Sequence, residues 1–294
     1  MLTAPTFETA VSAAKTVYRG RDRQFASRLD KWSELLGGGT LLSAIGPDDI
    51  DRAIGTLMSE SAQGWCPGAG VVDRDHKRAN GTVNRYVSVL SSFYKLLRLH
   101  RYLPRSFSSP IVKGLKLPDD PGRTIQITMT DVHRLIDASR MSKNRKLTAL
   151  ISVAVTTGLR KGNLIALTWK DIDLGKRTID IGMTKNGAPV RSILPPWVCT
   201  ELVKIKPRNA EDHWFVFDNK QFIKAWKSCI ERAEIPGLTC FHHLRHVAAS
   251  ILASSGASLI EVMTVLNHKS PSMSLRYMHL NTKSIETAVH RAWG

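Results

Sequence analysis

The proline-rich segment from residue 104 to residue 123 constrains the fold of this chain more than any other feature. Proline fixes its own backbone and lacks an amide hydrogen, so neither a helix nor a strand continues through a segment in which it recurs. Apolar residues recur with regular spacing on both sides, and 294 residues are enough for a core on each side. The sequence therefore predicts two domains, residues 1–105 and 125–294, joined by a basic linker at 106–124.

The first domain is predicted to be helical. Apolar residues spaced three and four apart indicate helices at 7–18, 25–36, 47–58 and 82–97. Residues 64–81 mix glycine, tryptophan and charged residues without a period, and we expect them to form a surface loop.

The second domain is predicted to combine helices with a small antiparallel sheet. Alternating apolar residues at 172–181 and a short strand at 190–194 flank Asn186-Gly187, a strong hairpin signal. Capping boxes at Thr128-Met129-Thr130-Asp131 and Ser258-Leu259-Ile260-Glu261 begin two of the expected helices. The fold class is mainly α with a small antiparallel β-sheet, an α+β chain.

The charge of the chain indicates a polyanionic partner. Lysine and arginine number 42 against 25 acidic residues, a net charge of +17. Nucleic acid is the leading partner and an anionic membrane the lesser one, because no long apolar run or signal peptide is present.

The four cysteines are not spaced as in a disulfide framework, which suits a protein of a reducing compartment. We expect a cytoplasmic, nucleoid-associated protein that does not bind membranes.

The stretch from Thr239 to Ser250 is the main candidate for chemistry. If it is helical, His242, Arg245 and His246 share one face. Imidazoles exchange protons near neutral pH, and a guanidinium offers a planar fork of donors to a phosphate. The pattern therefore predicts a site for an anionic oxygen.

Three other interpretations of this stretch compete with the site for an anionic oxygen, and the sequence argues against the first two. A zinc hydrolase needs a glutamate where His243 stands. A structural metal held with Cys240 has no second ligand pair in the sequence. A helix with ordinary surface histidines remains open from this stretch alone. We expect no metal and no cofactor.

Several motifs follow one another in a recognisable order. They are TGLR ending at Arg160, a lysine at Lys185 in a strand turn, HHLRH from His242 to His246, and LNH ending at His268, with Tyr277 nine residues further on. In this order they resemble the tyrosine recombinases of the phage integrase family. The resemblance covers the second half of the chain.

The resemblance implies metal-independent cleavage and rejoining of DNA. Tyr277 would form a 3′-phosphotyrosine and leave a free 5′ hydroxyl that can attack it and reseal the strand. Arginines and a histidine would hold the phosphate, Lys185 would protonate the leaving oxygen, and His242 would act as base with His246 as a second imidazole. The catalytic candidates are Arg160, Lys185, His242, Arg245, His268 and Tyr277.

The resemblance also implies the partners. They are double-stranded DNA with a specific recombination site, three further copies in a homotetramer, and accessory DNA-bending proteins. A helical core-binding (SAM-like) domain, without an arm-binding domain before it, would clamp DNA together with the catalytic domain during integration or excision of a mobile element. The candidates for DNA contact are Arg85, Lys95, Lys113, Lys116, Arg123 and His246.

The chain departs from the family pattern at three positions. Asn163 stands where an acid is common, His243 where an aspartate is usual, and Asn267 where a glycine precedes the later histidine. These departures leave two alternative functions open, namely a type IB topoisomerase and a DNA-binding protein that has lost catalysis.

Overall fold

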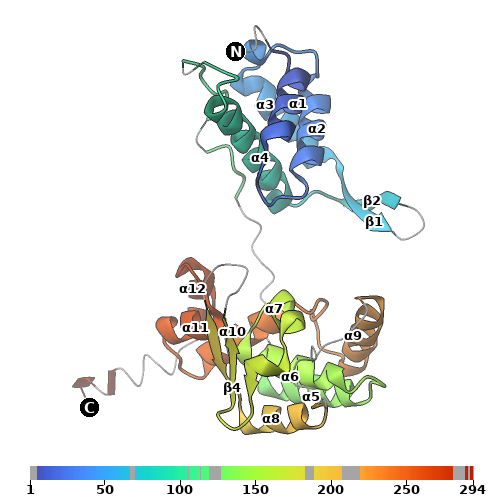
Figure 1. Ribbon diagram of the computed structural model, residues 1–294, viewed down its shortest axis with the longest axis vertical. Helices are drawn as coiled ribbons and strands as arrows, with labels where there is room; N and C mark the ends of the chain where they lie inside the picture. Colours follow the sequence, from blue (N-terminus) through green and yellow to red (C-terminus); the bar gives the residue numbers. More distant parts are fainter. Residues whose placement is uncertain are drawn as a thin grey trace. The chain divides into compact units, whose positions relative to one another are not determined.

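The computed structural model describes residues 5–66, 70–104, 106–112, 114–118, 127–182, 189–206, 219–280, 289–290 and 292–293. The chain divides into two compact units, Met1–Arg123 and Thr124–Gly294, which are described separately below (Figure 1). Three candidate residues, Lys113, Arg123 and Lys185, lie outside the described residues.

The first unit is built on four helices, as the apolar spacing predicts. Each helix buries the face on which its apolar residues recur, and α4 packs against the other three. Trp32 and Phe93 are fully buried at the centre of this core. The helices are α1 (Phe7–Val17), α2 (Phe25–Leu36), α3 (Pro47–Ser59) and α4 (Asn80–Leu99).

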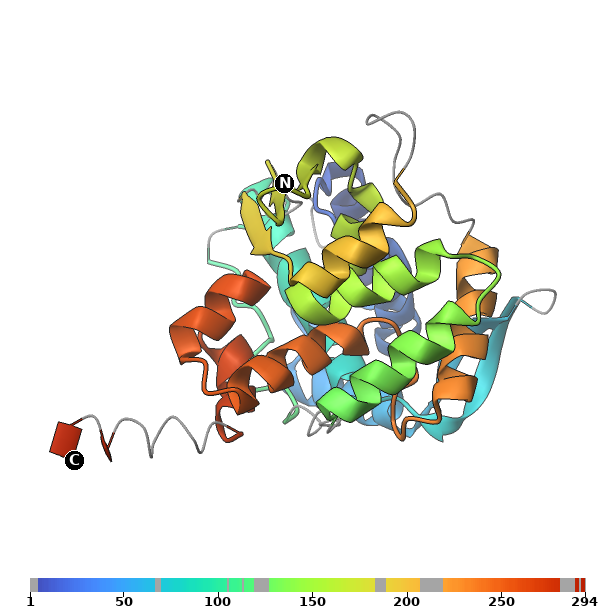
Figure 2. The same cartoon turned by 90° about the horizontal axis from the view of Figure 1, so that it is seen from below.

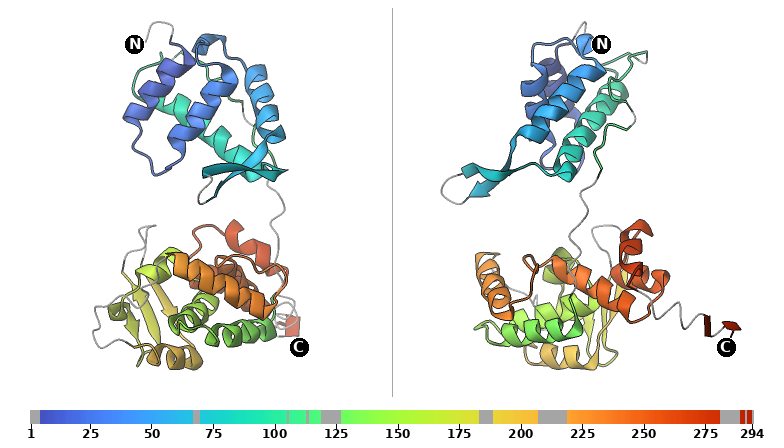
Figure 3. Two further views of the ribbon diagram at one scale, coloured as in Figure 1. Left: turned by 90° about the vertical axis from the view of Figure 1, so that its right-hand side faces the viewer. Right: turned by 180° about the vertical axis from the view of Figure 1, so that it is seen from behind.

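Residues 64–81 do not form the surface loop expected from the sequence. Strands β1 (Ser61–Cys66) and β2 (Gly70–Lys77) pair antiparallel and form a hairpin that projects from the helices (Figure 3). Residues 73–77 of β2 are all exposed, so this part of the strand has no buried face. A strand with one buried face shows alternating apolar and polar residues in its sequence. Residues 73–77 have no such alternation, so the sequence pattern did not predict a strand there.

The described part of the expected linker packs on the first unit. Phe107, Ile111, Leu115 and Leu117 lie against the core of the four helices. The Asn84 side chain on α4 donates to the carbonyl of Leu117 at 2.9 Å and accepts from its amide at 2.8 Å. Residues 106–112 and 114–118 are therefore held on α4. Prolines stop regular structure but do not prevent packing, so a linker without helices or strands can still be fixed on a domain.

The second unit is arranged around α6. Almost every residue of this helix is buried, and it lies between α5 and α10 (Figure 2). Both capping boxes expected from the sequence are present, at Thr128 before α5 and at Ser258 before α11. The helices are α5 (Met129–Arg140), α6 (Lys146–Thr157), α7 (Lys161–Ala166), α8 (Pro196–Val203), α9 (Asn219–Ala233), α10 (His243–Ser254), α11 (Leu259–Leu266) and α12 (Ser272–Met278).

A small antiparallel sheet of β3 (Ile172–Asp173), β4 (Thr178–Ile181) and β5 (Val190–Ile193) completes this unit. Ile181 pairs with Val190 at the end of the β4–β5 ladder, and Asn186-Gly187 lies outside the described residues. The predicted class, mainly α with a small antiparallel sheet, is confirmed. None of the helices described is long and apolar enough to span a bilayer.

Candidate active site

Gly158 forms the turn that brings Arg160 to the start of α7. It ends α6 in the left-handed conformation with φ of 60°, as the sequence predicts for a helix end. A Cβ at this position would lie 2.2 Å from Cδ2 of Leu266 on α11. Glycine is therefore required both by the backbone conformation and by the close approach of α11.

Replacing Gly158 with alanine is expected to lower the free energy of unfolding by about 2–4 kcal/mol, since left-handed strain adds to the clash with Leu266. Gly256→Ala is the matched control, because Gly256 has φ of +94° but nothing within 4 Å of an added Cβ. Urea unfolding of both variants separates the two effects. Equal losses would show that the clash contributes nothing.

Arg245 is fixed in place by two main-chain carbonyls. Its guanidinium donates to the carbonyl of Gly158 at 2.6 Å and to that of Leu266 at 2.5 Å, and the residue is only 7% exposed. It thereby joins α10 to the ends of α6 and α11. Burial and the neighbouring charge of Arg160 lower the pKa of Arg245 to about 10. The guanidinium stays charged at neutral pH and keeps a fixed direction.

His268 is placed by an unusual backbone conformation. Asn267 caps α11 in the left-handed region, with φ of 49° and ψ of 56°. Asparagine tolerates this region better than other residues with a Cβ, which explains how it can stand where the family pattern has glycine. Nδ1 of His268 lies 2.6 Å from Oγ of Ser274, a fully buried residue of α12. Burial, followed by the charges of Arg245 and Arg160, lowers the pKa of His268 to about 4.

Tyr277 lies on α12 with its hydroxyl against α10. Its Oη contacts Nδ1 of His246, and the Arg276 side chain also hydrogen-bonds to the tyrosine. The residue is 5% exposed and packs with a small apolar cluster that includes Ala248 and Val262. Burial raises the pKa of Tyr277, while the charges of Arg276 and Arg245 oppose this rise.

The structure distinguishes the two imidazoles that the sequence placed on one helix face. His246 contacts the tyrosine hydroxyl, whereas His242 caps α10 and meets His246 edge to face, with ring centroids 5.6 Å apart. His243 accepts a hydrogen bond from the amide of Thr239 at 3.4 Å. The sequence assigned His242 to the tyrosine proton, with His246 as a second imidazole and a candidate for DNA contact, and in the structure it is His246 that contacts the tyrosine hydroxyl.

The site carries positive charge without acidic partners. Within the described residues, Arg160, Arg245 and Arg276 form no ion pair with a carboxylate. Burial, followed by the charges of His242, His243, Arg276 and Arg245, lowers the pKa of His246 to about 4. An anion would relieve this repulsion, so the site is suited to a phosphate. The structure groups no three potential metal ligands among the residues it describes.

Acidification from pH about 7.5 to about 5 is expected to destabilise the protein through His246 and His268. Their pKa values are about 4 in the folded protein against 6.5 in the unfolded chain. The unfolded chain therefore binds protons first, so stability is full above pH 6.5 and falls as the pH drops toward 4. Allowing for solvent screening, the loss is on the order of 1 kcal/mol per histidine. The urea midpoint of unfolding, measured at several pH values, gives this loss of stability. A double His246→Asn, His268→Asn variant that lost as much stability on acidification as the parent protein would contradict the prediction.

Sequence reasoning missed two residues of the site. Ser274 holds His268, and Arg276 contacts the tyrosine. Arg276 could have been found, because it directly precedes Tyr277 and carries a charge suited to a phosphate. Ser274 had no sequence signal, since its role depends on the packing of α12 against the loop after α11.

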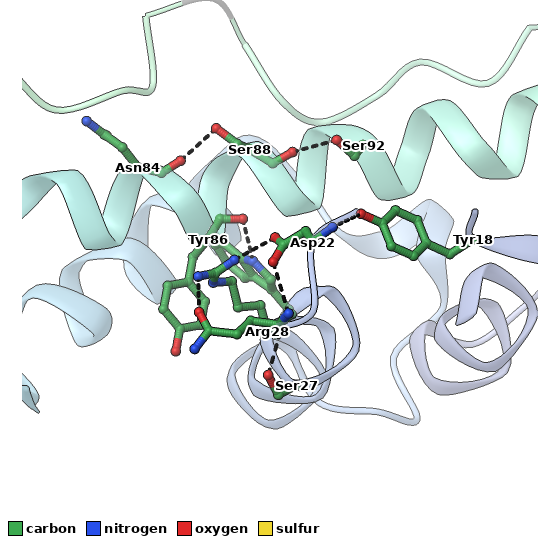
Figure 4. A network of polar contacts seen from close by, with 10 residues as sticks. Tyr18, Asp22, Ser27, Arg28, Asn84, Tyr86, Ser88 and Ser92 are labelled. Carbon is green, nitrogen blue, oxygen red and sulfur yellow. Dashed lines mark hydrogen bonds and ion pairs between the residues drawn. The ribbon is translucent and has the colours of Figure 1, made fainter. Parts of the chain in front are cut away.

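Of the DNA-contact candidates on the first unit, Arg85 and Lys95 are exposed on α4, and Lys116 is exposed after it. A groove lies between the start of α2 and the middle of α4. In it, Arg28 is held by Asp22 at 2.6 Å and by Gln24 (Figure 4). Its lining residues include Tyr18, Asp22, Arg28, Arg85, Ser88 and Ser92.

The chain is similar in sequence to proteins of one known family. Residues 126–284 match the phage integrase family. The shufflon-specific DNA recombinase of Escherichia coli is 29% identical over 68% of this chain, which spans 51% of that protein. The tyrosine recombinase XerA of Saccharolobus solfataricus is 26% identical, covering 79% of this chain and 74% of its own length.

Solved structures show the same fold. The Tn1549 transposon integrase in complex with transposon right end DNA aligns with a TM-score of 0.73 at 15% identity, covering 98% of this chain and 100% of that one. A lambda integrase tetramer bound to a Holliday junction aligns with a TM-score of 0.69 at 15% identity, covering 95% and 79%. Because the family match spans more than half of the 294 residues, the chain belongs to the phage integrase family of tyrosine recombinases.

Proposed function

We propose that the protein is a site-specific DNA recombinase that breaks and rejoins DNA through a 3′-phosphotyrosine at Tyr277. The observation that carries the proposal is the contact of the Tyr277 hydroxyl with an imidazole, inside a cluster of arginines without carboxylate partners among the described residues. The relatives named above are recombinases, which favours this function over a topoisomerase or a protein that only binds DNA.

The scissile phosphate would be held by side chains. Phosphodiester cleavage builds negative charge on the non-bridging oxygens, and fixed donors in a partly buried site stabilise that charge. Arg160 stands at the N-cap of α7, and Arg245 is already anchored by two carbonyls, so its guanidinium need not reorganise. With Nδ1 of His268 accepting from Ser274, Nε2 of the neutral ring carries a proton that it can donate to the phosphate.

In the proposed reaction Oη of Tyr277 attacks phosphorus and the bond to the 5′ oxygen breaks. Lys185, which lies outside the described residues, would protonate that leaving oxygen. The phosphotyrosine conserves the energy of the diester. A 5′ hydroxyl can therefore attack it and restore a strand without ATP.

The first unit would serve as the core-binding domain and the second as the catalytic domain, clamping a duplex that carries the recombination site. Arg85 and Lys95 on α4, with Lys113, Lys116 and Arg123 after it, would contact phosphates. The net charge of +17 supports such binding. We further propose a homotetramer on DNA, accessory DNA-bending proteins, a cytoplasmic, nucleoid-associated location, and integration or excision of a mobile element as the outcome.

A covalent-adduct assay tests the function. The protein is incubated with a library of nicked duplexes in EDTA, denatured, and scored for protein-linked DNA, and the linked peptide is located by mass spectrometry. Linkage at Tyr277 is expected, and sequencing the trapped DNA defines the site. Salt-sensitive binding by a folded protein that never forms an adduct would overturn the proposal.

A further inference from the structure

The hydroxyl of Tyr277 has two polar neighbours. The Arg276 side chain hydrogen-bonds to the tyrosine, and a guanidinium can only donate, so Oη is the acceptor of that bond. Nδ1 of His246 contacts the same oxygen. In the ring tautomer that carries its proton on Nε2, Nδ1 is the unprotonated nitrogen and accepts the hydrogen bond of the tyrosine hydroxyl.

We infer that His246, rather than His242, is the catalytic base that accepts the Tyr277 proton during cleavage and returns it during rejoining. The inference rests on the proposed function. In cleavage the proton moves from Oη to Nδ1 as the bond from Oη to phosphorus forms and the bond from phosphorus to the 5′ oxygen breaks. In rejoining the 5′ hydroxyl attacks phosphorus and passes its proton back to the amine of Lys185, Oη leaves, and Nδ1 returns its proton to Oη.

The groups around His246 keep it ready to accept. His242, His243 and Arg245 face it from α10, His268 from the loop after α11, and Arg276 from α12. Burial and these groups hold the pKa of His246 at about 4, so the ring is neutral and able to take a proton at pH 7. A bound phosphate adds negative charge beside the ring, which raises its pKa toward the range of an efficient base. Substrate binding would thus strengthen the base.

His242 lacks this geometry. Its ring meets His246 edge to face and is itself exposed, and the structure shows it in contact with His246 rather than with the tyrosine oxygen. Burial, followed by the charges of Arg245 and Arg160, lowers its pKa, and a bound phosphate would offset the effect of the two arginines.

Two substitutions of His246 separate proton transfer from positioning. Oδ1 of asparagine can occupy the place of Nδ1, so His246→Asn keeps an acceptor for the tyrosine hydroxyl but cannot take its proton. His246→Ala removes both. We expect both variants to slow adduct formation on the trapped nicked duplex about equally, by roughly 10²–10⁴-fold, and to remove the same ionisation from the pH profile. His242→Asn should keep that ionisation.

Recovery of the rate in His246→Asn would show that His246 only positions the tyrosine, and loss of the ionisation in His242→Asn would assign the base to His242. Either result overturns the inference while leaving the proposed function intact. Absence of an adduct with the parent protein overturns both.

A measurement without DNA tests the contact independently. Nitrogen chemical shifts of labelled histidines at pH 7 should show unprotonated Nδ1 and protonated Nε2 for His246, and Tyr277→Phe should shift the Nδ1 signal. A protonated Nδ1 would exclude His246 as the base whatever the DNA assays show.

Discussion

Replacing Tyr277 with phenylalanine is expected to abolish the covalent DNA adduct, lowering its formation by at least about 10³-fold, while DNA binding changes by no more than about twofold. The substitution removes only the hydroxyl, which is the attacking group in the proposed reaction. The loss of the contact with His246 should cost about 1 kcal/mol of stability. The adduct is measured on denaturing gels, and binding is measured by fluorescence anisotropy with a labelled duplex.

Tyr94→Phe is the matched control for this experiment. The Tyr94 hydroxyl is buried in the first unit and has no hydrogen-bond partner among the residues that the structure describes. Its removal should leave adduct formation unchanged and stability unchanged or slightly higher, because no bond is lost. An adduct that survives Tyr277→Phe would refute the assignment of the nucleophile.

Replacing Arg245 with lysine is expected to damage both stability and cleavage. A lysine keeps the charge but carries a single ammonium, which cannot reproduce the fork that reaches the carbonyls of Gly158 and Leu266. Leaving one buried carbonyl unpaired should lower the free energy of unfolding by about 1–3 kcal/mol. Cleavage should fall by about 10²–10³-fold because the donors that face the phosphate lose their fixed direction.

Arg160→Lys distinguishes the two effects of Arg245. Arg160 is partly exposed at the start of α7, so its replacement should slow cleavage but change stability by less than about 0.5 kcal/mol. Urea unfolding measures stability, and adduct formation at saturating DNA measures cleavage. If Arg160→Lys and Arg245→Lys lowered the free energy of unfolding by similar amounts, the hydrogen bonds of Arg245 to the two carbonyls would not be the cause of the stability loss in Arg245→Lys.

The sequence determined the elements and the order of the motifs. The helix periods of the first domain and the capping boxes at Thr128 and Ser258 depend on residues a few positions apart, and the structure confirms them. The hairpin at β1 and β2 was not predictable in this way, because its described side chains in β2 do not alternate between a core and solvent. The packing of residues 106–112 and 114–118 depends on Asn84, which lies 33 positions before Leu117.

The assembly of the site was decided only by the tertiary structure. Residues four apart on a helix share a face, so the spacing alone did not show which of His242 and His246 contacts the tyrosine, and the family resemblance named His242 as the base. The packing of α12 against α10 makes the choice, since it sets the Tyr277 hydroxyl on His246 across a separation of 31 residues. Local spacing determines which side chains a helix face presents, whereas their contact with a distant group depends on how the apolar surfaces of separate helices pack together.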